Sequence, residues 1–396
     1  QAKNSLHATT SIYNSLASDE LTITSNLPQY DVYLKNQIPA NNTSNPFSGF
    51  YKVIYSCNAA IEGLEDNSTI AEVTRNQYIG EAKFNRALCY FYLSNLYGGV
   101  PLITSTDVGI SSTAPREDSS KIYDQIQTDL KDAIIKLSPD YNTGSMGRSR
   151  ANKWAASALL ARVYLYQRDY INAGKLASDI INSGLYNLLD NPAGIFIKDN
   201  SETILQWDNN ATEGNNDLAA NANQNPPSYI VTSSLLNSFE ANDLRKTTWI
   251  GSKIYNNQIY YYPFKFTSTA ATSAERYVVL RLSEQYLIRA EAEAMQNHLN
   301  EAIADVNYIR LRHGGLATPL PIPVDQSHCM GLILHERRVD LFTEGMHRWF
   351  DLKRLNKIDE VMQAEKPDTW TSTASLYPIP LSDLQRNPNL TQNPGY

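Results

Sequence analysis

The sequence has 396 residues, which allows two or three domains or one large unit built from repeats. Hydrophobic residues make up 42% of the chain, enough for a sizeable core, and no run approaches the roughly 18 apolar residues of a membrane span. The formal net charge of −7 argues against nucleic acid as the main partner, because phosphate binding needs a basic face.

The beginning of the chain and its cysteines give two further expectations. The first residue is Gln1 and no charged, apolar leader follows, so we expect a processed or trimmed chain whose export signal is no longer present. Cys57, Cys89 and Cys329 are an odd number without CxxC spacing, which excludes a disulfide framework and a cysteine-rich zinc site.

Two helices are predicted in the first third of the chain. Residues 78–97 carry apolar or aromatic side chains at close to a 3.6-residue period, and Gly98, Gly99 and Pro101 then end the pattern. Residues 123–137 repeat this periodicity. The first part of the chain is therefore expected to be helical.

Two pairs of helices joined by short turns are predicted further along. Residues 153–168 and 170–184 form the first pair, which resembles a tetratricopeptide unit, and residues 284–297 and 301–312 form the second. Their similar length and style indicate helical-hairpin repeats, which bury their apolar faces by stacking on one another.

Two segments are predicted to be long loops. Residues 36–49 and 208–228 are crowded with Asn and Pro, and we expect neither helix nor strand in the second of them. Long loops inside a compact domain are often functional, but they are also often plain surface insertions. Both interpretations remain open from the sequence.

An aromatic-rich stretch follows the second loop, with nine rings between residues 229 and 266. If Tyr260, Tyr261 and Tyr262 lie in a strand, the first and third share one face and the second lies on the other. At least one ring would then face solvent or a ligand. Rings beside Asn and Asp side chains suit carbohydrate, because a sugar stacks its C–H face on a ring while its hydroxyls bond to amides. The alternative is that these tyrosines only cover the helical scaffold.

The densest charged run is HERRVDLFTEGMHRWFDLKR, residues 335–354, where acids and bases alternate with aromatic residues. We interpret it as a set of partly buried Arg–carboxylate pairs that lock two helices together. The alternative is an acidic or cationic ligand site. The balance of acids and bases favours the structural interpretation.

No catalytic, cofactor or metal motif is found. There is no P-loop, GxGxxG or GxSxG sequence, and the HE pair at residue 335 lacks the second His of a zinc protease motif. Asp208, Asn210 and Thr212 loosely resemble the start of a calcium loop, but the glycine is misplaced and no Glu closes it. We therefore predict no cofactor, no metal and no catalytic residue.

Several sequence blocks spread over nearly the whole chain resemble those of known proteins. They are residues 47–64 (FSGFYKVIYSCNAAIEGL), 80–104 (GEAKFNRALCYFYLSNLYGGVPLIT), 148–173 (RSRANKWAASALLARVYLYQRDYINA), 281–292 (RLSEQYLIRAEA), 307–315 (NYIRLRHGG), 336–354 (ERRVDLFTEGMHRWFDLKR) and 376–396 (LYPIPLSDLQRNPNLTQNPGY). In this order they resemble the SusD/RagB-like family of nutrient-binding outer-membrane lipoproteins, with Phe47 where Trp is usual.

The resemblance implies a mostly α fold of tetratricopeptide-like helical hairpins with a variable loop-rich part. It implies a single unit over residues 1–396, with the scaffold in 1–190 and 276–396 and the ligand-binding part in 191–275. Members are anchored to the outer membrane by a lipid on an N-terminal cysteine and face outward. They cover a SusC-like TonB-dependent transporter and capture glycans or, in some members, peptides. The anchoring cysteine is missing here, and the chain is short for the family, so the binding surface is expected to be small.

The matching blocks belong to the scaffold, so the ligand site is predicted from the residue types in the loops. The expected ligand-binding side chains are Trp207, Tyr229, Trp249, Tyr255, Tyr260, Tyr30 and Tyr33, with Asn41, Asn42, Asn209 and Asp243 as hydrogen-bonding neighbours. The leading hypothesis is a non-enzymatic protein that captures an oligosaccharide and hands it to the transporter. The alternatives are a peptide ligand in the same role, a glycosidase, and a tetratricopeptide adaptor without a small ligand.

Overall fold

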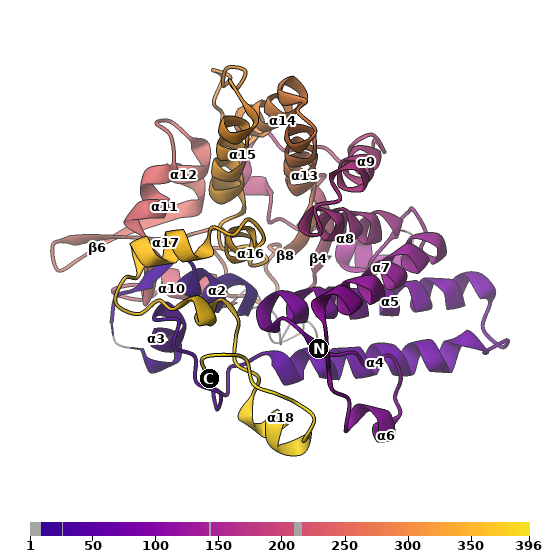
Figure 1. Ribbon diagram of the computed structural model, residues 1–396. Coiled ribbons are helices and arrows are strands. Elements are labelled where there is room, and N and C mark those ends of the chain that lie inside the picture. The colour runs from indigo at the N-terminus through magenta and orange to yellow at the C-terminus, as the bar shows by residue number, and fades with distance from the viewer. Residues whose placement is uncertain (1–8, 26, 142–143, 210–215) are drawn as a thin grey trace.

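The structure is a computed structural model that describes residues 9–25, 27–141, 144–209 and 216–396 (Figure 1). Helices dominate the fold. The longer helices are α4 (Phe47–Glu65), α5 (Glu72–Tyr97), α7 (Ser119–Lys136), α8 (Lys153–Tyr166), α9 (Tyr170–Ile181), α13 (Leu282–Met295), α14 (Leu299–Arg312) and α15 (Gln326–Leu341). The shorter helices are α2 (Asn14–Ala17), α3 (Pro28–Leu34), α6 (Val108–Ser111), α10 (Asn216–Ala222), α11 (Ser233–Ser238), α12 (Leu244–Trp249), α16 (His347–Arg354), α17 (Ile358–Glu365) and α18 (Leu381–Arg386). The remaining short helical segments, of the 3-10 or π type, are η1 (Thr9–Tyr13), η2 (Gly144–Ser149), η3 (Pro192–Gly194) and η4 (Ser372–Ser375).

The long helices form a continuous stack of antiparallel hairpins. Helix α4 packs on α5, and the order continues through α7, α8, α9, α13 and α14, with α15 against the last two (Figure 1). The stack passes from α9 to α13 at small residues. A Cβ on Gly174 would lie 3.1 Å from that of Ala292, and Ile288 shares one buried cluster with Ala173 and Ala177. The predicted mostly α fold of tetratricopeptide-like hairpins is confirmed.

The observed helix limits follow from local signals. Helix α5 ends where predicted, at Gly98 with a φ of 74°, but begins earlier, at Glu72. Its first turns are exposed, with Val73 82% accessible, so apolar periodicity could not reveal them. Helix α8 begins after Asn152, whose side-chain oxygen accepts from the backbone N of Ala155 at 2.9 Å.

The strands form four two-stranded antiparallel sheets. They are β1 (Leu21–Ile23) with β5 (Tyr229–Val231), β2 (Val100–Pro101) with β3 (Arg116–Glu117), β4 (Thr203–Trp207) with β8 (Tyr277–Arg281), and β6 (Ile250–Tyr255) with β7 (Gln258–Pro263). Two of these pairs, β1–β5 and β4–β8, join segment 191–275 to residues outside it. That segment is therefore hydrogen-bonded into the helical scaffold at both of these pairs.

The β6–β7 hairpin shows the predicted alternation. Asn256 and Asn257 both have positive φ, as a two-residue type I′ turn requires. Tyr262 is 7% exposed, whereas its neighbour Tyr261 is 38% exposed. Tyr262 therefore lies toward the core and Tyr261 lies on the other face toward solvent, as expected for a strand. Tyr260 shares the face of Tyr262, but it is nearer the turn and only half-buried.

The expectation that residues 208–228 hold no helix is wrong. The segment contains α10, whose sequence NDLAANA combines one Leu with three Ala, all strong helix formers. Leu218 and Ala219 are buried, so tertiary packing adds to that propensity. The surrounding Asn and Pro residues masked this short helix in the sequence.

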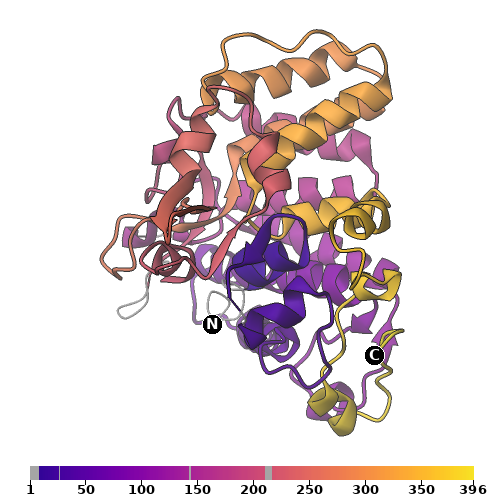
Figure 2. The ribbon, with the colours of Figure 1, turned by 90° about the vertical axis from the view of Figure 1, so that its left-hand side faces the viewer.

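The C-terminal segment returns to the N-terminal helices (Figure 2). Lys366 Nζ donates to the carbonyl of Leu16 at 2.7 Å, and the backbone N of Tyr377 donates to the carbonyl of Leu96 at 2.8 Å. Further on, Asn45 Nδ2 donates to the carbonyl of Pro378 at 2.9 Å, which holds α18 beside the start of α4. Of the helices described, none is both long and apolar enough to cross a bilayer.

Candidate functional site

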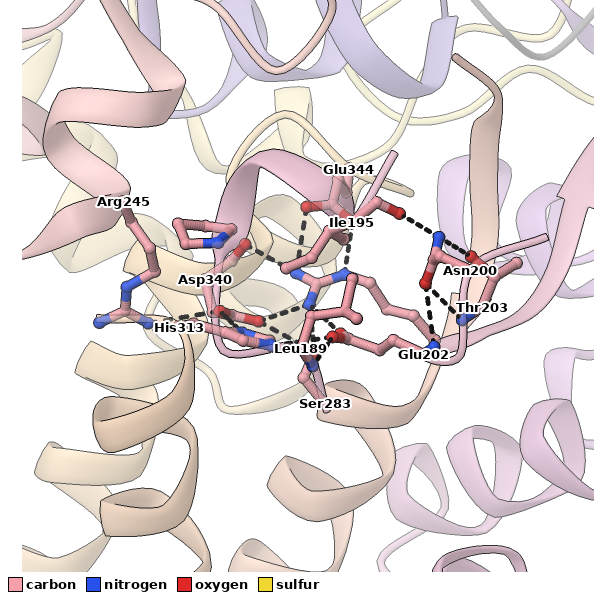
Figure 3. Close-up of polar contacts among 12 residues, drawn as sticks. Leu189, Ile195, Asn200, Glu202, Thr203, Arg245, Ser283, His313, Asp340 and Glu344 are labelled. Atoms are coloured by element: carbon pink, nitrogen blue, oxygen red, sulfur yellow. Dashed lines mark hydrogen bonds and ion pairs between the residues drawn. The ribbon is translucent and has the colours of Figure 1, made fainter. Parts of the chain in front are cut away.

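A buried cluster of charged side chains fixes the strands against the helices (Figure 3). Arg281, at the end of β8, contacts Glu202 at 3.1 Å, Asp340 at 2.7 Å and Glu344 at 2.9 Å. All four side chains are at most 8% exposed. Because Glu202 precedes β4 and Asp340 lies on α15, this cluster ties the β4–β8 pair to the C-terminal helices.

His313, just after α14, bridges two acids of the same cluster. Its Nδ1 lies 2.8 Å from Asp340 Oδ1 and its Nε2 lies 2.9 Å from Glu202 Oε2. Burial alone would lower the pKa of His313, but the two carboxylates outweigh it and raise the pKa to about 9. The pKa of Asp340 lies well below its usual range, because Arg281 and His313 overcome the opposing effect of burial. His313 is therefore a cation in the core at neutral pH.

The charged run 335–354 has the structural role predicted from the sequence. Arg337 on α15 donates to Asp351 on α16 at 2.7 Å, and both side chains are buried. Arg354 contacts both Asp351 and Glu291, which connects α16 to α13. The predicted Arg–carboxylate pairs between two helices are confirmed, and they are more deeply buried than expected.

Two predicted site residues lie in the core beside this cluster. Trp249 is 1% exposed, and its indole N–H donates to the carbonyl of Pro192 at 3.1 Å. Lys265 Nζ lies 4.4 Å from the centre of the Trp249 ring, a cation–π contact inside the protein. Asp243 is 2% exposed, caps α12 and pairs with Arg245 at 2.9 Å. The expectation that the Trp249 ring and the Asp243 carboxylate face a ligand is wrong, because both side chains are buried and already contact other groups of the core.

Two further predicted tyrosines are also buried, one beside the first loop and one directly after the second. Tyr33 is fully buried and stacks on Tyr13 with ring centroids 4.5 Å apart. Tyr229 is 2% exposed within β5. The expectation of surface rings at these positions is wrong, because α3 and β5 direct these two side chains inward, where they pack among other aromatic residues. Tyr30 remains half-buried and meets the Tyr229 ring edge-on at 5.9 Å.

The two asparagines of the first loop differ in their surroundings. Asn41 is exposed. Asn42 is half-buried, and its side-chain amide donates to the hydroxyl of Tyr33 at 3.2 Å and accepts from the backbone N of Ser44 at 3.0 Å. Asn42 therefore stabilises its own loop as well as lying near the surface.

Trp207 is the outer ring of a three-ring stack. Its ring lies 5.0 Å from that of Tyr277 at an interplanar angle of 14°, and Tyr277 stacks in turn on Phe266 at 6.4 Å and 11°. Tyr277 and Phe266 are buried, whereas Trp207 is half-buried. The neighbouring Asn209 is also half-buried and donates to the carbonyl of Glu275 at 3.2 Å. The stack gives Trp207 a rigid support close to the surface.

Tyr255 and Tyr260 share one face of the β6–β7 hairpin. The register places Lys253 opposite Tyr260 and Tyr255 opposite Gln258, so these four side chains are neighbours on that face. Tyr255 is 38% exposed and Tyr260 is half-buried, and the Tyr260 hydroxyl donates to Gln258 Oε1 at 3.1 Å. Lys253 Nζ donates to the carbonyl of Ala222 at 2.6 Å, which fixes the hairpin to the end of α10.

The opposite face of the hairpin was not predicted as part of the site. Ile254, Ile259 and Tyr261 lie there and are 72%, 53% and 38% exposed. The two-residue alternation of the Tyr260–Tyr262 stretch contained the signal for Tyr261. Ile254 and Ile259 gave no signal, because an isoleucine in a strand is more often buried.

Asp208, the first residue of the loose calcium-loop pattern, is engaged with cations. It pairs with Arg276 and lies 3.7 Å from Lys198 Nζ. Asn210 and Thr212, the other two residues of that pattern, lie outside the described residues. Within the described ranges, no group of three or more acidic, His or Cys side chains is arranged to hold a metal ion.

The fold defines a class of proteins built from stacked helical hairpins, and comparison with known proteins identifies the family. A sequence model of the SusD family matches residues 237–396, and a model described as starch-binding, associating with the outer membrane, matches residues 1–165. The chain belongs to the SusD family.

Individual relatives agree over nearly the full length. SusD-like protein P25 of Formosa agariphila is 25% identical over 90% of this chain and 80% of its own. The crystal structure of a SusD superfamily protein from Bacteroides thetaiotaomicron superposes with a TM-score of 0.86 at 25% identity, covering 99% of this chain and 96% of that one. A laminarin-binding SusD-like protein gives a TM-score of 0.81 at 25% identity, covering 97% and 94%.

Proposed function

We propose that this protein is a non-catalytic glycan-binding protein of the cell surface that passes an oligosaccharide to a SusC-like TonB-dependent transporter. The observation that carries the proposal is the face of the β6–β7 hairpin with two neighbouring tyrosine rings, one of them 38% exposed, beside the amide of Gln258. Such a face can stack the C–H side of a sugar and bond to its hydroxyls. The likeness to a laminarin-binding SusD-like protein supports a saccharide as the ligand.

Trp207 supplies a second ring of the same kind. Its support by Tyr277 means that a ligand stacking on its other face would meet a ring that is already ordered, so little side-chain entropy would be lost on binding. Ring stacking at about 1 kcal/mol per contact, together with several hydrogen bonds to sugar hydroxyls, can reach the roughly 4 kcal/mol of a millimolar dissociation constant, which allows release as well as capture.

Isothermal titration against a panel of glycans tests this function. We expect binding of at least one oligosaccharide, such as laminarihexaose or maltohexaose, and about a three- to tenfold loss of affinity in Tyr255→Ala and in Trp207→Ala. Tyr78→Ala is the matched control, because Tyr78 is 43% exposed on α5 and is not part of the proposed site. If no glycan produced a binding signal and a peptide mixture did, the proposed ligand would be a peptide rather than a saccharide.

Membership of the SusD family is what supports the transporter partner and the lipid anchor in this proposal. The description of the family model that matches residues 1–165 includes association with the outer membrane, which supports this location. Affinity purification of the tagged, lipid-anchored protein from outer membranes should recover a TonB-dependent transporter in stoichiometric amount. Recovery of the tagged protein alone, under conditions that keep other outer-membrane complexes intact, would count against the partner.

A further inference from the structure

A groove lies on the scaffold, away from the β6–β7 hairpin. It runs between α4, the segment after α5, the end of α6 and the C-terminal helix α18, and its volume is about 670 Å³. Ligand sites for small molecules span about 300–1,000 Å³. Figures 1 and 2 show α18 at the lower end of the molecule and the β6–β7 hairpin on another side, so the two surfaces are separate.

Three rings on α4 line this groove at four-residue intervals. Phe47, Tyr51 and Tyr55 follow one another along the same helix face, with steps of about 6 Å. The Phe47 and Tyr51 rings are 4.9 Å apart, and the Tyr51 hydroxyl donates to the carbonyl of Pro101 at 2.7 Å, so this part of the wall is rigid. Tyr55 continues the row and is 56% exposed. Its ring is the one that a ligand can cover.

Charged groups on α18 provide the polar side of the groove. Ser48 Oγ donates to Asp383 Oδ2 at 3.0 Å, which fixes the carboxylate at the groove. Asp383 Oδ1 and the Arg386 guanidinium both have no hydrogen-bond partner within the part of the chain that the structure describes. A carboxylate acceptor and a guanidinium donor therefore remain available three residues apart on one helix.

We propose that this groove is a second saccharide-binding site, which holds a short sugar chain along α4. A sugar unit stacks on the ring of Tyr55, its hydroxyls donate to Asp383, and Arg386 donates to its oxygens. A purely apolar ligand would leave the carboxylate and the guanidinium without partners, and desolvating them would cost free energy. This inference rests on the proposed function, because it concerns the same class of ligand.

The test distinguishes the two sites by substituting the aromatic residues of each site separately and together. Titrations use laminarihexaose, maltohexaose and a galacturonate trimer, which distinguish neutral from acidic saccharides, and the groove variants are made in the wild type and in the Trp207→Ala/Tyr255→Ala background. We expect residual binding in that background, with a further loss of about three- to tenfold in Tyr55→Ala and retention in Tyr55→Phe. Asp383→Asn should also weaken binding, and the Tyr78→Ala control should not.

The outcomes distinguish this inference from the proposed function. If the wild type binds a saccharide but Tyr55→Ala and Asp383→Asn match the Tyr78→Ala control, the groove is not a binding site and the function stands. If the groove variants weaken binding and the Trp207→Ala/Tyr255→Ala protein does not, the groove is the main site. If no saccharide binds the wild type, both proposals are overturned.

Discussion

Replacing His313 with Gln is expected to change how stability depends on pH. The imidazole lies between Asp340 and Glu202 in the core, and its pKa rises from 6.5 to about 9. A raised pKa means that the folded protein holds the proton more tightly than the unfolded chain. The stabilisation from the charged ring is therefore complete below pH 6.5 and is lost as the pH rises through about 9.

The size of the effect follows from the same values. At about 1.36 kcal/mol per pH unit between the unfolded and folded pKa, the pH-dependent contribution of His313 is on the order of 3 kcal/mol. Lys265 also titrates in this region, because burial lowers its pKa to about 8, and its contribution to stability changes in the opposite direction. Comparison of the wild type with His313→Gln removes effects that the two proteins share.

The assay is urea unfolding of both proteins at pH 6.0 and pH 9.5, followed by circular dichroism. We expect the wild type to be more stable than His313→Gln at pH 6.0, and the difference in unfolding free energy to shrink by roughly 3 kcal/mol at pH 9.5. A difference that stays constant between the two pH values would show that His313 is not held as a cation between the two carboxylates.

Two further predictions concern the stability of the fold rather than ligand binding. Trp249→Ala should destabilise the fold by about 3–5 kcal/mol because it leaves a large cavity, whereas Tyr255→Ala should change stability by under about 0.5 kcal/mol; equal effects in thermal unfolding would contradict this assignment. Asn152→Ala should cost about 1 kcal/mol or more, since it loses the cap of α8 and the hydrogen bond that the buried Asn152 amide donates to the carbonyl of Pro139; the denaturant midpoint measures the loss, and an unchanged midpoint would refute the capping role.

Most of the helical scaffold could be predicted from the sequence because its signals are local. The periodicity in residues 78–97 and the capping and turn residues near α8 and α9 depend only on near neighbours in the chain. The charged run 335–354 was also interpretable, since balanced acids and bases among aromatic residues indicate pairing. The short helix α10 was missed because the Asn and Pro residues around it masked the helix propensity of its Leu and Ala residues.

The candidate site could be predicted only in part, because the residue types in a segment do not show which of its aromatic side chains are buried and which are exposed. Trp249 and Tyr255 lie close together in an aromatic-rich stretch, yet one fills the core and the other reaches solvent. What decides between them is the packing of α12 against η3, where the Trp249 indole donates to the carbonyl of Pro192, 57 residues away in the chain. The groove at α18 could not be predicted either, because residues 47–55 and 383–386 meet only in the folded chain.

The most direct test of the account is a titration of the intact protein and its Tyr255→Ala/Tyr260→Ala double variant with the best-binding oligosaccharide. The hairpin carries both rings on one face, so their joint removal should lower the affinity by about tenfold or more while the unfolding midpoint stays nearly unchanged. Equal affinities for the two proteins would contradict capture of sugar by the surface rings of this hairpin.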